Sequence, residues 1–124
     1  MDLQFLDFDC GEEADGDGSF DALASVAAPR LAALHAEIAR VLGWAHDAFP
    51  GACAPPEDGG TWHYDLAGRR ETTVEQRIAF DPATGRIAAE DTGAAPGVRH
   101  TVSLSIAGNA AFCAAFRDAF GLAD

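Results

Sequence analysis

Hydrophobic residues recur at helical spacing between Pro29 and Phe49. Placed at about 100° per residue, they form one stripe about 80° wide, with Arg40 and Asp47 opposite. The stripe consists of Leu31, Leu34, Ile38, Val41, Leu42, Ala45 and Phe49. Proline suits the first turn of a helix, where its missing N–H donor costs nothing, and Pro50-Gly51 ends the pattern. The pattern therefore predicts an amphipathic helix over residues 29–49.

Alternation of hydrophobic and polar residues predicts strands in the second half of the chain. It covers Trp62–Leu66, Val74–Phe80, the residues from Ile87 onward and Arg99–Ile106. The segment Asp81-Pro82-Ala83-Thr84-Gly85-Arg86 is typical of a tight hairpin turn, because Pro fixes φ and Gly accepts a positive φ. Near the N-terminus, Leu3–Phe8 is rich in strand formers and predicts a short first strand.

A final helix is predicted over residues 110–120, with Asn109 as its N-cap and Gly121 directly after its end. The elements then follow the order strand, helix, four strands, helix, and strands joined by short turns must be antiparallel. We therefore predict a single α+β domain over residues 1–124 that contains an acidic loop at residues 9–21. The domain is expected to be a two-layer sandwich, with both helices on one face of a meander of about five strands.

The same reasoning predicts the strand register, because a slip by one residue would move every apolar side chain to the wrong face. It pairs each of the last four strands with the next and sets Phe80 opposite Ile87. One row at the end of the sheet then holds Trp62, Gln76, Asp91 and His100. An aromatic ring beside an amide, a carboxylate and an imidazole suits a small-molecule pocket, with Asp91 orienting His100 as a general base. In the alternative interpretation, these residues simply meet water at the sheet end.

Charge narrows the range of partners. The chain has 20 Asp and Glu against 8 Lys and Arg, a formal net charge of −12. Repulsion from phosphates argues against binding of nucleic acid or of anionic membranes. No apolar run approaches the length of a membrane span, and the start of the chain lacks a basic signal-peptide region, so we expect a cytoplasmic protein. The absence of lysine, together with abundant alanine, indicates a biased genome, which we interpret as bacterial.

The predicted acidic loop carries a partial calcium-binding pattern. Glu13, Asp15 and Asp17 alternate, a glycine and a phenylalanine follow, and Asp21 ends the run. This spacing resembles the first nine positions of an EF-hand calcium loop. Position 12 of such a loop is a bidentate Glu, whereas this chain has Ala24 there, and position 1 is Glu instead of Asp. The resemblance implies weak binding of a divalent cation, and a solvated acidic loop explains the same residues.

Trp44 is the one large aromatic residue of the predicted long helix that lies off the apolar stripe. It projects on the side of Glu37 and Arg40. Two explanations are open: either the acidic segment folds over Trp44, or these residues mark a dimer or partner surface.

Motifs for catalysis or cofactor binding are missing from the sequence. The three cysteines, Cys10, Cys53 and Cys113, are widely spaced and fit neither a disulfide framework nor a zinc site. We find no nucleotide-binding, hydrolase or zinc-protease motif.

We therefore expect a small acidic binding protein without catalytic activity or cofactor. It would be either a homodimer or an inhibitor of the immunity-protein type, which charge steers to a basic partner. The alternatives are a small-molecule binder or enzyme that uses the row with His100, and a weak cation-binding protein.

Overall fold

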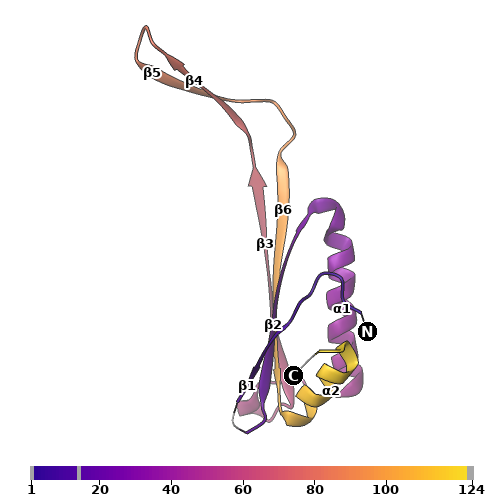
Figure 1. Cartoon of the computed structure of the whole chain (residues 1–124). Helices are drawn as coiled ribbons and strands as arrows, with labels where there is room; N and C mark the ends of the chain where they lie inside the picture. The colour runs from indigo at the N-terminus through magenta and orange to yellow at the C-terminus, as the bar shows by residue number, and fades with distance from the viewer. Residues whose placement is uncertain (1, 14, 123–124) are drawn as a thin grey trace.

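The computed structural model describes residues 2–13 and 15–122. Within these residues the chain forms six strands and two α-helices, which confirms the predicted α+β class (Figure 1). The elements are β1 (Asp9–Glu12), β2 (Gly18–Ala27), α1 (Leu31–Ala48), β3 (Trp62–Thr73), β4 (Gln76–Asp81), β5 (Arg86–Asp91), β6 (Gly97–Gly108) and α2 (Ala110–Phe120). Single turns of 3-10 helix, Ala28–Arg30 and Pro56–Asp58, precede α1 and β3.

The main sheet has the strand order β1-β2-β6-β3, and each neighbouring pair is antiparallel. Ile106 of β6 lies opposite Phe20 of β2 on one side and opposite Tyr64 of β3 on the other. The predicted meander is therefore wrong in its order, because β6 lies between β2 and β3 and does not pair with β5. The predicted acidic loop at residues 9–21 is also wrong, since it contains β1 and the start of β2.

Alternating burial explains why residues 18–27 form a strand. Phe20, Ala22, Ala24 and Val26 are buried, and the residues between them are half-buried or exposed. Such a strand is stabilised where its apolar side lies on the covered face of a sheet. β6 provides this neighbour, because its own buried row lies on the same face.

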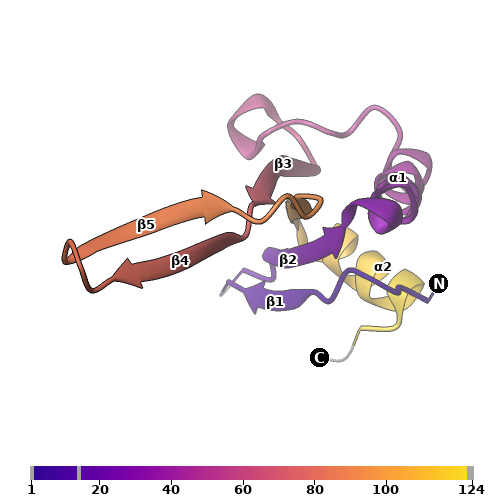
Figure 2. The ribbon, with the colours of Figure 1, turned by 90° about the horizontal axis from the view of Figure 1, so that it is seen from above.

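Both helices cover the same face of the main sheet, as predicted (Figure 2). The apolar stripe of α1 faces the core, and four of its residues, Leu34, Ile38, Val41 and Ala45, are buried. The helix begins at Leu31, after the 3-10 turn that contains Pro29. The interior between the layers is largely aromatic at one end, where Phe20, Trp62, Phe112 and Phe116 are fully buried.

The predicted boundaries of α2 are confirmed. The side chain of Asn109 accepts a hydrogen bond from the backbone N–H of Phe112 at 2.9 Å, which is the bond expected of an N-cap. Gly121 ends the helix with a φ of 65°, in the left-handed region. None of the helices in the described part of the chain is both long and apolar enough to cross a membrane.

Residues 2–8 form no strand, in contrast to the prediction for Leu3–Phe8. The backbone N–H groups of Gln4, Phe5 and Leu6 donate hydrogen bonds to the carboxylate of Glu37 in α1. The distances are 2.9 Å for Phe5 and 2.7 Å for Leu6. Because the Glu37 carboxylate satisfies these backbone N–H groups, the segment needs no neighbouring strand as hydrogen-bond partner there. Its side chains Leu6 and Phe8 are buried.

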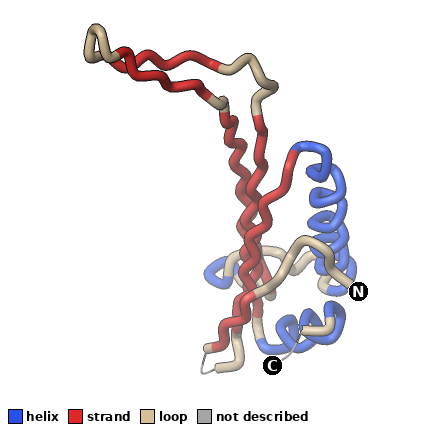
Figure 3. Tube along the Cα trace, turned by 45° about the horizontal axis from the view of Figure 1, so that its top comes forward, coloured by secondary structure: helices blue, strands red, loops and turns tan. Residues whose placement is uncertain are grey.

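β4 and β5 form a separate two-stranded sheet. The ribbon of β3 and β6 extends beyond the helices, and the β4–β5 hairpin continues from its end (Figures 1 and 3). The hairpin bends away from the face that α1 and α2 cover (Figure 2).

Candidate functional site: an amphipathic hairpin arm

We call residues 69–99 the hairpin arm; it consists of the distal parts of β3 and β6 with all of β4 and β5. Exposed large hydrophobic side chains concentrate on and near this arm. Among the described residues they are Leu23, Tyr64, Leu66, Val74, Ile78, Phe80 and Ile87, and all but Leu23 lie on β3, β4, β5 or the β3–β4 link. Such a concentration on one projecting ribbon is typical of an interaction surface.

The register of the hairpin separates two chemically different faces. Ile78 lies opposite Ala89, and Phe80 lies opposite Ile87, so these four residues share one face. On the other face Arg77 lies opposite Glu90, and their side chains form an ion pair at 3.8 Å. The hairpin is therefore amphipathic, and every residue of both strands is exposed.

The tip of the hairpin is held by local hydrogen bonds. Asp81 accepts a bond from the backbone N–H of Ala83 at 2.9 Å, and its carbonyl accepts one from Gly85 at 2.8 Å. Gly85 has a φ of 71°, which the turn requires and which only glycine adopts easily. At the base, Thr92 donates to the Glu75 carbonyl at 3.1 Å. The apolar face is thus presented on a closed, hydrogen-bonded ribbon.

The predicted polar row does not form as a unit. Gln76 does lie opposite Asp91, as predicted, and the amide of Gln76 donates to the Asp91 carboxylate at 3.3 Å. Trp62 and His100 lie elsewhere, because β3 runs without a turn to Thr73 and pairs with β6 instead of β4. The predicted register is therefore correct within the β4–β5 hairpin and wrong for its neighbours.

The structure gives the two displaced residues separate surroundings. Trp62 is fully buried in the core, where its ring stacks on Phe112 with centroids 5.4 Å apart. Its indole N–H is buried and has no hydrogen-bond partner among the residues that the structure describes. His100 is half-buried in β6, between Val26 and Arg70 of the two neighbouring strands. Neither residue shares a site with the Gln76–Asp91 pair.

The acidic residues of the EF-hand-like segment are distributed along the β1–β2 hairpin. Asp15 accepts a bond from the backbone of Asp17 at 3.1 Å, and Asp21, within β2, accepts one from the hydroxyl of Ser105. Glu13 takes part in the turn through its backbone, and Ala14 lies outside the described residues. In residues 2–13 and 15–122, no three His, Cys, Asp or Glu side chains are gathered as a metal site requires.

The side chains proposed as an interface on the long helix are largely engaged within the molecule. Trp44 contacts α2, with ring centroids 5.4 Å from Phe120 and 5.8 Å from Phe116. Glu37 is only 2% exposed and holds the N-terminal segment, while Arg40 pairs with it at 3.5 Å. The sequence did not indicate that α2 covers Trp44, because helix-to-helix packing depends on residues far apart in the chain.

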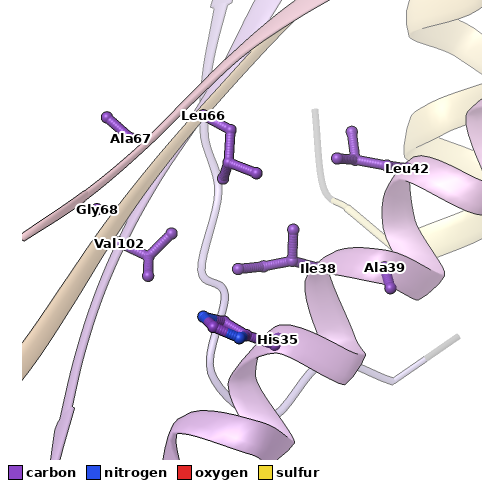
Figure 4. Close-up of a pocket in the computed structure, with 8 residues that line it drawn as sticks. All are labelled: His35, Ile38, Ala39, Leu42, Leu66, Ala67, Gly68 and Val102. Atoms are coloured by element: carbon purple, nitrogen blue, oxygen red, sulfur yellow. The ribbon is translucent and has the colours of Figure 1, made fainter.

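A second apolar surface is a groove between α1 and the sheet (Figure 4). Its volume is about 460 Å³, and His35 is its only ionisable lining residue. The lining consists of His35, Ile38, Ala39 and Leu42 of α1 with Leu66, Ala67, Gly68 and Val102 of the sheet. Apart from His35, its lining is small and aliphatic, so the groove suits contact with apolar groups.

The outer edge of β3 is available for pairing over most of its length. Residues 52–54 cover its start through a bridge between Cys53 and Trp62. Beyond that bridge no strand in the described part of the chain pairs with this edge, because β3 is the last strand of the sheet. An unpaired edge can accept a further strand. The predicted meander had Trp62–Leu66 as the first of four strands and paired it with Val74–Phe80, so the open edge of a strand that continues to Thr73 was not predicted.

Cys113 has no features of a nucleophile. The thiol is buried, it lies 3.3 Å from the carbonyl oxygen of Gly108, and burial raises its pKa above the ordinary value. It therefore stays protonated at neutral pH.

Comparison of the chain with models of protein families, with curated proteins and with solved structures finds no match.

Proposed function

We propose that this chain is a binding protein without catalytic activity, which docks to another protein through the apolar face of its hairpin arm. The observation that carries the proposal is the exposure of Ile78, Phe80 and Ile87, which is 65%, 61% and 64%. A partner that buries these three side chains would gain about 1.5–3 kcal/mol of free energy for each of them.

The shape of the arm supports a protein as the partner. Small molecules bind in concave sites that enclose most of their surface, whereas the arm is a projecting ribbon (Figure 1). The apolar face of the ribbon can pack against an apolar surface of similar size on a protein, while its charged face stays in water. The exposed Arg77–Glu90 pair then remains in water, where it costs nothing to keep.

The net charge of −12 supports a second form of the same function. A strongly acidic chain attracts basic proteins over long distances, and charge steering of this kind is typical of inhibitors that bind basic enzymes. In that form the acidic residues outside the arm would guide the encounter, and the arm would supply the apolar contact.

A photo-crosslinking amino acid on either face of the arm tests the proposal. We would place it at position 80 in one variant and at position 79, on the opposite face, in a matched control. Illumination in the presence of an extract from the source organism is expected to give protein adducts at position 80 and few at position 79. Equal yields at both positions, or no adducts, would contradict the proposal.

A further inference from the structure

We infer that the partner of the arm is a second copy of this chain, bound so that the apolar faces of two hairpins pack against each other. This inference rests on the proposed function of the arm and names its partner. Three features carry it: the charge of the arm, the shape of its apolar face and the fact that the face is uncovered in the single chain.

Charge within the chain is divided unevenly. The hairpin arm holds five of the eight arginines and five of the twenty carboxylates, so it is neutral. The arginines are Arg69, Arg70, Arg77, Arg86 and Arg99, and the carboxylates are Glu71, Glu75, Asp81, Glu90 and Asp91. The net charge of −12 therefore belongs to the rest of the chain. The net repulsion between two copies therefore comes from the rest of the chain, and the arm adds no net charge to it.

Distance reinforces this separation of charge. The β1–β2 turn lies at one end of the main sheet, and the arm leaves from the other end (Figure 1). Electrostatic repulsion is screened over about 8 Å at physiological ionic strength. Contact between the arms thus joins two acidic molecules while their acidic ends stay apart.

The apolar face of the hairpin is suited to pairing with itself. A dimer with two-fold symmetry uses the same surface on both copies, so that surface must be complementary to itself. Ile78, Phe80, Ile87 and Ala89 carry no charge and no hydrogen-bonding group in their side chains. The Gln76–Asp91 pair, at the base of this face, satisfies its own hydrogen bond. A contact limited to these four apolar side chains buries no polar side chain.

An unsupported two-stranded hairpin is only marginally stable in water. Because every residue of β4 and β5 is exposed in the single chain, a partner that covers their apolar face would stabilise the hairpin. A second copy is present wherever the first is made. The contact uses about four side chains from each copy, so its area is at the lower end of specific interfaces and the dimer is expected to dissociate on dilution.

Sedimentation equilibrium of the full chain tests the inference. The wild type is expected to change from the mass of one chain to that of two as its concentration rises. In Phe80→Asp, which places a charge on the apolar face, the dissociation constant should rise about tenfold or more. Ala79→Asp adds the same charge on the opposite face and should leave it nearly unchanged. Near-ultraviolet circular dichroism checks that the core around Trp62 is intact in each variant.

Salt provides an independent test of the charge argument. Raising the ionic strength from about 0.01 M to about 0.15 M shortens the screening length from about 30 Å to about 8 Å. Dimerisation of two acidic copies should then become stronger, whereas binding of a basic partner would become weaker. A dimer that weakens with salt would overturn the inference.

The outcomes distinguish the inference from the proposed function on which it rests. A chain that stays monomeric at all concentrations, yet forms adducts with a different protein at position 80, overturns the second-copy inference and leaves the docking function standing. A dimer that Phe80→Asp does not weaken overturns it as well, because another surface then holds the copies together. A monomer that forms no adducts at position 80 contradicts both.

Discussion

Glu37 is the clearest case of a residue whose role depends on contacts far away in the sequence. Its carboxylate accepts hydrogen bonds from the backbone N–H groups of Gln4, Phe5 and Leu6, and these bonds fix the N-terminal segment to α1. A pattern-based prediction places a glutamate beside an arginine on a helix surface. The buried role became visible only when residues more than thirty positions earlier were placed against it.

Removing this carboxylate should destabilise the protein. In Glu37→Ala the N–H groups of residues 4–6 lose their acceptor, at least one of them in a buried position. We expect a loss of about 2–4 kcal/mol in the free energy of unfolding, measured by urea denaturation. Glu57→Ala, which changes an exposed glutamate, is the control and should cost little. Equal effects of the two substitutions would show that Glu37 does not anchor the segment.

Cys113 predicts how stability depends on alkaline pH. Burial raises the pKa of its thiol, so the folded protein keeps the proton to a higher pH than the unfolded chain, whose thiol has the ordinary value of 9.0. The stability is therefore complete below that value and declines as the pH rises above it. We expect a smaller decline between pH 8 and about pH 10 in Cys113→Ala than in the wild type, measured by urea denaturation. Cys10→Ala removes an exposed thiol and should behave like the wild type.

At the scale of elements, local patterns were sufficient where neighbours in the sequence are also neighbours in space. The two helices and the Asn109 cap were predicted, as was the Phe80–Ile87 register, because each depends on residues within one turn, one helix or one hairpin. The pairing of β2 with β6 was not predicted, since it joins residues about 80 positions apart. β2 also carries alanine at two of its core positions, which weakens its hydrophobic signal.

The arm itself was predicted as a hairpin but not as a projection. Alternation at Ile78, Phe80 and Ile87 indicated an apolar face, and we expected the helices to cover it. The helices instead cover the main sheet. β3 and β6 extend past the helices, so the hairpin at their end lies beyond the helices' reach (Figure 1). Sequence periodicity shows that a face is apolar but does not show what it packs against.

The β4–β5 hairpin should therefore be dispensable for the fold of the remainder. Because Thr92 is hydrogen-bonded to Glu75, a two-residue Asn-Gly turn can replace residues 76–91. We expect this shortened variant to unfold cooperatively, within about 1 kcal/mol of the monomeric Phe80→Asp variant, as followed by tryptophan fluorescence. Loss of cooperative unfolding would show that the hairpin supports the core.

At the scale of the whole molecule, the chain separates two tasks. Its helices and main sheet form a core with strongly acidic surroundings, and the neutral arm carries most of the large apolar side chains that the described residues expose. In the proposed dimer, the high net charge keeps the rest of the two molecules apart, and the arm is the surface through which they meet. In this dimer the apolar face of the hairpin is covered at high protein concentration and uncovered at low concentration.

Hydrogen exchange of the hairpin amides measures this cover directly. At high protein concentration, the amides of β4 and β5 that bond across the hairpin should exchange slowly, and dilution should speed their exchange while that of β6 stays unchanged. Phe80→Asp should show the fast rate at every concentration, and Ala79→Asp should follow the wild type. Fast exchange of the hairpin amides in the wild type at all concentrations would contradict the account.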